Sequence, residues 1–102
     1  MIDLPAIRNA ARGCGYAIAE HGSRQRDLDI VAIPWTDRAA DAATLVREVA
    51  YHGKLTCSDP GADMPHGRRA FVLRDPKRKP GDPVYVDLSV MPRAAAAKEH
   101  KP

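Results

Sequence analysis

The sequence has no apolar run that approaches the ~20 residues of a membrane-spanning helix. Its first five residues, Met1 to Pro5, lack the basic segment and apolar stretch of a secretory signal peptide. The chain has 2 cysteines, and Cys14 and Cys57 do not have the spacing of metal ligands. Isolated cysteines in a chain without a secretion signal are typical of free thiols in a reducing compartment. These absences predict a cytoplasmic protein without a membrane partner.

The chain is short and carries no internal repeat. Its 102 residues match one domain, large enough for one core but not for a separate substrate-binding domain. The formal net charge of +3 is compatible with a nucleotide or nucleic-acid partner, although many soluble domains carry such a charge. We therefore expect a single domain over residues 1–93. Residues 94–102, which begin with an alanine run, are expected to form a flexible or helical tail.

The spacing of apolar residues predicts an α+β fold. Helical spacing is found over residues 3–12 and 38–51, with Asp3 as the cap of the first helix and Thr36 or Asp37 as the cap of the second. Alternating apolar residues and short apolar runs predict strands over residues 15–20, 27–33, 54–57, 69–74 and 84–90. Short connections favour antiparallel pairing of neighbouring strands. The expected architecture has two layers, a small mixed and mostly antiparallel sheet with helix over one face.

Glycines and prolines divide these elements. Gly53 is expected to end the second helix. Residues 58–68 are rich in glycine and proline, so we expect a loop there. Pro34 ends the second strand, and Trp35 is expected to pack at the edge of the core.

Two aspartates open the second predicted strand. Strand side chains alternate between faces, so Asp27 and Asp29 should project from the same face. Two neighbouring carboxylates repel each other, and a divalent cation relieves that repulsion because hard cations take oxygen ligands. The alternative is a solvated pair at the end of a hairpin, with Asp27 ion-paired to Arg24 or Arg26.

A third aspartate occupies the middle of the last predicted strand. Asp87 is flanked by Val86 and Leu88, although aspartate is depleted in strands. If this strand lies near the one that carries Asp27 and Asp29, three carboxylates converge. Three acids can hold two metal ions, which clamp the attacking and leaving oxygens in phosphoryl or nucleotidyl transfer. The alternative is an exposed face of an edge strand.

The turn Gly22-Ser23, the strand Asp27-Leu28-Asp29-Ile30 and the later strand Val86-Asp87-Leu88 resemble the nucleotidyltransferase superfamily of DNA polymerase beta. The resemblance covers roughly residues 14 to 90 and implies a nucleotidyltransferase-like fold. It implies that Asp27 and Asp29 ligate two Mg²⁺ (or Mn²⁺) ions. It also implies that Asp87 ligates the catalytic metal and helps to activate the attacking hydroxyl, and that Gly22 and Ser23 contact the triphosphate of a nucleoside triphosphate.

A second resemblance is to a group of short phage and prophage proteins of unknown role. If the chain is encoded by a phage, its compartment is the host cytoplasm. The similar stretches are His21-Gly22-Ser23, Arg26-Asp27-Leu28-Asp29, Pro34-Trp35, Pro65-His66-Gly67-Arg68 and Asp87-Leu88-Ser89-Val90-Met91-Pro92-Arg93.

The chain departs from the nucleotidyltransferase pattern between Gly-Ser and Asp-x-Asp. That family usually has a short helix and a longer spacer there, whereas only Arg24, Gln25 and Arg26 intervene in this sequence. The N-terminus of such a helix normally faces the phosphates. Without it, phosphate binding depends on the backbone N–H groups of the turn and on Arg24 or Arg26.

Two basic segments offer further candidates. In residues 65–69, His66 is a candidate proton shuttle or phosphate donor and Arg68 a candidate phosphate clamp, and a hairpin would bring them near the end of the Asp87 strand. The alternative is a solvated basic turn. The run Lys77-Arg78-Lys79 is a candidate contact to a nucleic-acid backbone, or simply a solvated hairpin tip. His21 adjoins the Gly-Ser turn and is a weaker candidate.

Two functions remain open at this point. The first is a minimal nucleotidyltransferase that moves a nucleoside monophosphate from a nucleoside triphosphate to a hydroxyl acceptor, with Mg²⁺ or Mn²⁺ as cofactor. The second is a catalytically inactive, phage-encoded module of the same fold that binds or inhibits a host protein or nucleic acid. The sequence does not decide between them, nor whether a homodimer completes the cleft.

Overall fold

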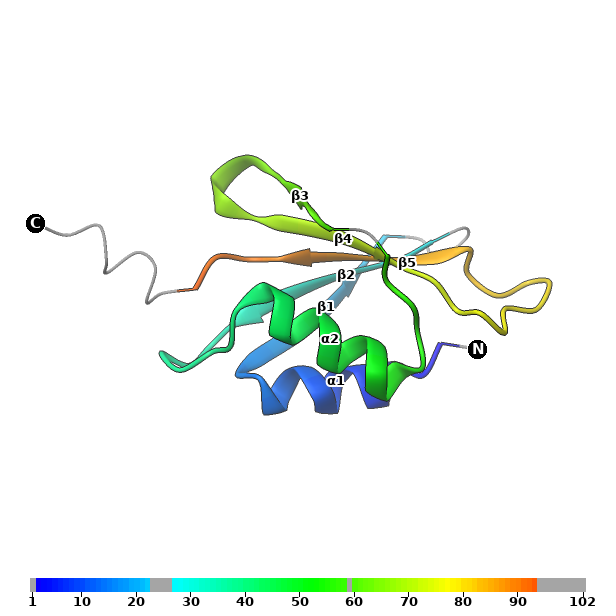
Figure 1. The fold of residues 1–102 in the computed structure, drawn as a ribbon, viewed down its shortest axis with the longest axis horizontal. Coiled ribbons are helices and arrows are strands. Elements are labelled where there is room, and N and C mark those ends of the chain that lie inside the picture. Colours follow the sequence, from blue (N-terminus) through cyan, green and yellow to red (C-terminus); the bar gives the residue numbers. More distant parts are fainter. Residues whose placement is uncertain (1, 23–26, 59, 94–102) are drawn as a thin grey trace, which may run out of the picture.

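The computed structural model describes residues 2–22, 27–58 and 60–93 and shows a two-layer α+β domain. One layer is a mixed sheet with strand order β1-β2-β5-β4-β3, and the other is a pair of helices on one side of it (Figure 1). This confirms the fold class expected from the sequence. The elements are α1 (Leu4–Gly13), β1 (Tyr16–His21), β2 (Asp27–Pro34), α2 (Ala42–Gly53), β3 (Ala62–Asp63), the short 3-10 turn η1 (Pro65–Gly67), β4 (Arg69–Leu73) and β5 (Tyr85–Val90).

The order of the strands places the second and the last predicted strands side by side. β1 and β2 form the expected antiparallel hairpin, and β4 and β5 form another. Between the two hairpins, β5 runs parallel to β2, with Asp29 in register with Asp87. A parallel pair requires a long crossover, and here the chain passes through α2, β3 and β4 before it returns. The middle of the sheet is therefore made of β2 and β5.

The core lies between the sheet and the two helices. Side chains alternate along β2 and β5, so that Leu28, Ile30, Val86 and Leu88 are fully buried. Tyr16 is also buried, and its hydroxyl donates a hydrogen bond of 2.7 Å to the carbonyl of Ala40. That bond satisfies the polar end of the ring inside the core. The opposite face of the sheet has no helix over it among the described residues.

The first helix begins as predicted, and the second does not. The carboxylate of Asp3 accepts a hydrogen bond of 3.1 Å from the N–H of Ala6. The second helix starts at Ala42, with Asp41 rather than Thr36 or Asp37 as its cap. The expected start at residue 38 was wrong because the segment before Ala42 is bonded to the residue that follows α1, where the N–H of Ala40 donates to the carbonyl of Cys14 at 2.9 Å.

The second helix ends at Gly53, two residues beyond the predicted range 38–51. Lys54, which follows Gly53, adopts the left-handed conformation (φ 56°) that glycine usually adopts after a helix. The glycine serves packing instead, since a Cβ on Gly53 would lie 3.2 Å from Ile7 of α1. The contact between the two helices therefore explains why a glycine stands at this position.

Three other local predictions were wrong. Residues 54–57 do not form a strand, although Thr56 makes an isolated β-bridge with Arg74. Within the expected loop 58–68, the structure contains β3 and η1. Arg69 contacts Asp63 of β3 at 3.1 Å and the carbonyl of Pro60 at 2.9 Å. Trp35 does not pack at the core edge but is 66% exposed.

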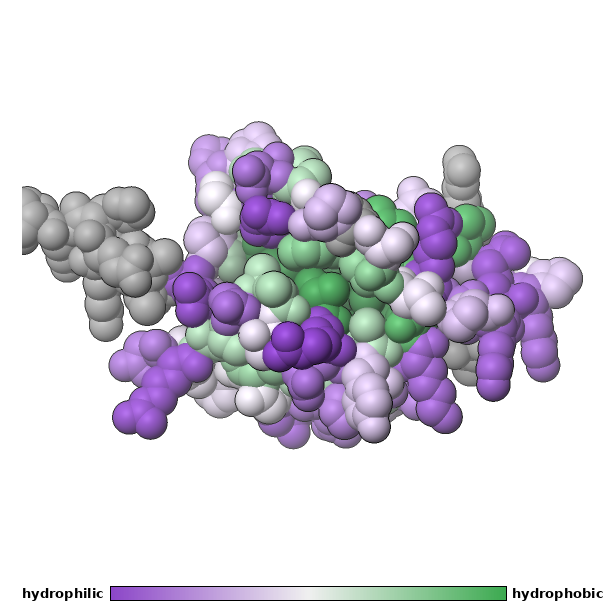
Figure 2. Space-filling model, in the orientation of Figure 1, coloured by the Kyte–Doolittle hydropathy of each residue, from purple (hydrophilic) through white to green (hydrophobic). Residues whose placement is uncertain are grey.

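Apolar surface also gathers beside the second helix. Figure 2 shows it between α2 and the strands, where Val46, Ala50 and Phe71 contribute to a groove of about 460 Å³. Within the described part of the chain, neither helix has the length and apolar character needed to cross a bilayer.

Candidate functional site

The polar residues of the uncovered face form a row across three strands. His21 of β1 is in register with Asp29 of β2, and Asp29 is in register with Asp87 of β5. Residues in register on neighbouring strands point to the same face, so these three side chains are neighbours. The sheet thus brings together two of the aspartates that the sequence singled out, from positions far apart in the chain.

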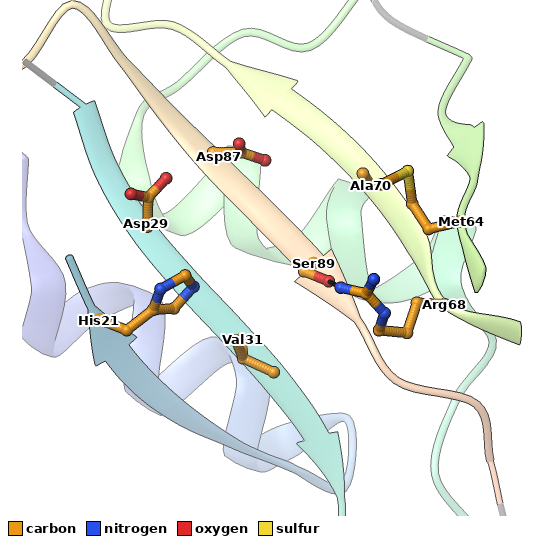
Figure 3. Close-up of a pocket in the computed structure, with 8 residues that line it drawn as sticks. All are labelled: His21, Asp29, Val31, Met64, Arg68, Ala70, Asp87 and Ser89. Atoms are coloured by element: carbon orange, nitrogen blue, oxygen red, sulfur yellow. Dashed lines mark hydrogen bonds between the residues drawn. The ribbon is translucent and has the colours of Figure 1, made fainter. Parts of the chain in front are cut away.

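These three side chains line a pocket on the uncovered face. Its volume is about 170 Å³, enough for a phosphate group and a few waters rather than a whole nucleotide. Figure 3 shows Asp29 and Asp87 on adjacent strands at one end of it and Arg68 beside Ser89 further along. The lining residues are His21, Asp29, Val31, Met64, Arg68, Ala70, Asp87 and Ser89.

The carboxylates repel one another. Partial burial raises the pKa of Asp87, and the negative charges of Asp29 and Asp27 raise it further, whereas His21 lowers it. The three carboxylates therefore interact electrostatically in the folded chain. A bound cation would remove this repulsion, which makes the end of the pocket that carries Asp29 and Asp87 a natural place for positive charge.

Asp27 lies one row further along the sheet. It is in register with Tyr85, two residues before Asp87 on the same strand. Its Oδ1 atom is buried and has no hydrogen-bond partner among the described residues. A buried oxygen without a partner is costly unless a ligand or ion satisfies it. Asp27 does not line the pocket and lies at the edge of the acidic cluster formed by Asp29 and Asp87.

The backbone of Gly22 lies close to the carboxylate of Asp29. Its φ of +86° is a conformation that other residues rarely adopt, and a Cβ on Gly22 would lie 2.8 Å from Oδ2 of Asp29. Only glycine lets the backbone at this turn approach the carboxylate so closely. The Gly-Ser turn singled out in the sequence therefore begins directly against the acidic cluster. Ser23, Arg24 and Arg26, the other predicted phosphate contacts of this turn, lie outside the described residues.

Arg68 supplies the positive charge of the pocket. Its Nη1 atom donates to Oγ of Ser89 at 3.4 Å, and its Nε atom donates to the carbonyl of Pro65 at 3.3 Å. The predicted hairpin of β4 and β5 brings it there, since the neighbouring Arg69 is in register with Val90. A guanidinium has five N–H donors, so Arg68 keeps donors for an anion beyond these two bonds.

Other predicted residues lie away from the pocket. His66 is exposed in η1 with a φ of 67° and does not line the pocket. Lys77, Arg78 and Lys79 lie in the exposed loop between β4 and β5, where the carboxylates of Asp75 and Asp82 hold the backbone N–H groups of Lys77 and Lys79. None of these four basic residues shares the pocket with Asp29 and Asp87.

The sequence reasoning missed Ser89 and treated His21 only as a weak candidate. Ser89 could have been found by alternation, because it follows Asp87 by two residues on the same strand face. Met64 could not, since its place depends on the irregular segment before β4. Across the described ranges, no three His, Cys, Asp or Glu side chains form a ready-made metal site.

Comparison with protein-family models, with curated proteins and with solved structures found no match to this chain.

Proposed function

We propose that this protein is a minimal nucleotidyltransferase that uses a divalent cation to move a nucleoside monophosphate from a nucleoside triphosphate to a hydroxyl acceptor. The observation that carries the proposal is the register of Asp29 with Asp87 on adjacent parallel strands at one end of an open pocket. Two adjacent carboxylates that repel each other suit a hard cation. The buried Oδ1 atom of Asp27, which has no hydrogen-bond partner among the described residues, adds a further oxygen that a cation could satisfy.

The small number of ligands fits magnesium bound together with its substrate. Mg²⁺ in such sites is held by one or two carboxylates, by water and by phosphate oxygens of the substrate rather than by a complete protein cage. Asp29 and Asp87 would supply the protein oxygens, with Asp27 at the edge of the cluster. When bound, the cation would neutralise charge on the phosphates and polarise the α-phosphate.

The chain's own residues have distinct parts in this reaction. Arg68 would hold a phosphate by charge-assisted hydrogen bonds from the guanidinium N–H groups that Ser89 and Pro65 leave free. The acceptor oxygen attacks the α-phosphorus and forms a bond to it. The bond between the α-phosphorus and the pyrophosphate oxygen breaks, and pyrophosphate leaves. Asp87 would act as the general base that accepts the proton of the attacking hydroxyl.

Thermal unfolding with and without ligands tests the proposal. Ligands that bind only the folded chain raise the midpoint by mass action, by about 2.7 kcal/mol of stability at a hundredfold excess over Kd. We expect Mn²⁺ or Mg²⁺ with one nucleoside triphosphate to raise the midpoint of the wild type. The double variant Asp27→Asn/Asp29→Asn should lose this shift, whereas Asp37→Asn, an exposed aspartate outside the pocket, should keep it.

Two results would contradict the proposal. One is no shift in the wild type with any of the four nucleoside triphosphates at millimolar concentration. The other is a shift that the double variant retains in full. Either result would favour the inactive binding module over the enzyme, and a pull-down for a host protein or nucleic acid would then be the next experiment.

A further inference from the structure

The single tryptophan of the chain lies on the surface. Trp35 directly follows β2, and its side chain is 66% exposed, although Trp is among the residues that gain most from burial. Its backbone N–H donates to the carbonyl of Gly15 at 3.0 Å, which holds the start of β1 and the end of β2 together. The ring is thus presented from an ordered part of the sheet rather than from a loose loop.

Two arginines flank this ring. Arg8 and Arg12 lie four residues apart on α1, so they share one face of the helix, and both are exposed. Together with Trp35 and residues of β1 they line a shallow pocket of about 320 Å³. Among the residues that the structure describes, the lining consists of Arg8, Arg12, Tyr16, Ala17, Ile18 and Trp35 and includes no acidic side chain.

We propose that this surface, the Trp35 surface, binds single-stranded nucleic acid, with a base stacked on the indole ring and the backbone phosphates against Arg8 and Arg12. Stacking platforms for single strands combine an exposed aromatic ring with cationic side chains, which is the chemistry found here. Arginine guanidinium groups bind phosphate through paired N–H donors. The absence of acidic residues from the lining adds charge complementarity to the anionic backbone.

A peptide strand fits the same surface less well. Such a strand would add to the free edge of β1 through backbone hydrogen bonds. However, Nη1 of Arg8 already donates to the carbonyl of Ile18 on that edge at 2.8 Å, so one of the acceptors that an added strand would need is occupied. The remaining N–H groups of Arg8 stay available for a phosphate.

The Trp35 surface is separate from the carboxylate pocket. Trp35 follows the last residue of β2, whereas Asp29 lies near its start, and six residues of strand span about 20 Å. The inference therefore does not rest on the proposed transferase activity. A nucleic acid bound here would also leave the Asp29–Asp87 pocket free for a phosphate group.

Because the chain has one tryptophan, its intrinsic fluorescence reports on this surface directly. The experiment titrates the full chain with 12-mers of oligouridine and oligothymidine and records Trp35 emission together with the anisotropy of the labelled strand. We expect saturable quenching that coincides with binding. The affinity should fall with salt with a slope of about −1.4 in log–log units if two phosphates are contacted.

Variants separate this surface from other basic regions. Trp35→Leu should weaken binding in the anisotropy assay by roughly 5-fold to 100-fold. Arg8→Ala/Arg12→Ala should bring the salt slope close to zero. Arg47→Ala, on α2 and outside this lining, and Tyr51→Leu, at an exposed aromatic ring on α2, are the matched controls and should bind like the wild type. The thermal midpoint of each variant confirms that it is folded.

Three results would overturn the inference. One is no change in Trp35 emission at millimolar concentrations of nucleotide units. A second is binding of the strand that Trp35→Leu leaves unchanged. The third is equal quenching by a 12-residue glutamate peptide, which would assign the surface to an acidic protein segment instead.

Discussion

Replacing Leu88 with alanine is expected to lower the free energy of unfolding by about 3 kcal/mol. Leu88 is fully buried in the middle of β5, in register with Ile30 on one side and Phe71 on the other. Its side chain therefore joins the two hairpins of the sheet, and the cavity left by alanine cannot close without moving both. In a domain of this size the loss corresponds to a thermal midpoint about 15 °C lower.

Denaturant titration of the full chain measures this effect, and the adjacent residue provides the control. Ser89 faces the pocket and not the core, so Ser89→Ala should change the free energy of unfolding by no more than about 0.5 kcal/mol. If Leu88→Ala were as stable as Ser89→Ala, β5 would not lie at the centre of the sheet. The parallel pairing that brings Asp87 beside Asp29 would then be wrong as well.

Without ligand, the variant Asp87→Asn is expected to be more stable than the wild type. It is also expected to lose the binding of the divalent cation and nucleotide. Burial and the charges of Asp29 and Asp27 raise the pKa of Asp87 above its ordinary value of 3.8. A carboxyl group whose pKa is raised by folding contributes stability below its unfolded pKa, and this contribution is lost as the pH rises through the folded pKa. At pH 7 the ionised Asp87 therefore destabilises the fold, and asparagine removes that cost.

Thermal midpoints across pH 3.5 to 7.5 measure this prediction. Asp87→Asn should unfold at a higher temperature than the wild type at pH 7, and the difference should shrink as the pH falls toward 3.8. In the presence of Mn²⁺ and nucleotide the order should reverse, since the variant lacks a ligand to the cation. A variant that is less stable than the wild type at pH 7 without ligand would contradict the prediction.

Asp41 provides a control, because folding shifts its pKa in the opposite direction to that of Asp87. The backbone N–H of Thr44 donates to its carboxylate at 2.8 Å, and this bond lowers the pKa of Asp41. A lowered pKa stabilises the fold above the unfolded pKa and ceases to do so as the pH falls through the folded value. Asp41→Ala should therefore lower the midpoint at pH 7, in contrast to Asp87→Asn.

Local patterns in the sequence predicted most of the sheet. Alternation along β2 and β5 places Leu28 with Ile30, and Val86 with Leu88, on one face of each strand, and the structure buries both of these faces in the core. The short connection between β1 and β2 likewise dictated an antiparallel hairpin. The placement of Arg68 beside the end of β5 followed from the second hairpin in the same way.

Contacts between distant segments could not be predicted. The parallel pairing of β2 with β5, which makes Asp29 and Asp87 neighbours, depends on the whole crossover and has no local signal. The start of α2 depends on the bond between Ala40 and Cys14, which are far apart in sequence. Trp35 is expected from the sequence at the edge of the core, and its exposure becomes visible only once the packing of β1 and β2 is known.

The proposed cation site at Asp29 and Asp87 is tested most directly by a ¹H–¹⁵N NMR spectrum of the labelled chain with a nucleoside triphosphate and substoichiometric Mn²⁺. The unpaired electrons of Mn²⁺ broaden the signals of the nearest amides first. We expect the amides around Asp29 and Asp87 to broaden before all others and Asp87→Asn to abolish this effect. Broadening that begins instead at Asp75 and Asp82, in the exposed loop before β5, would contradict this expectation.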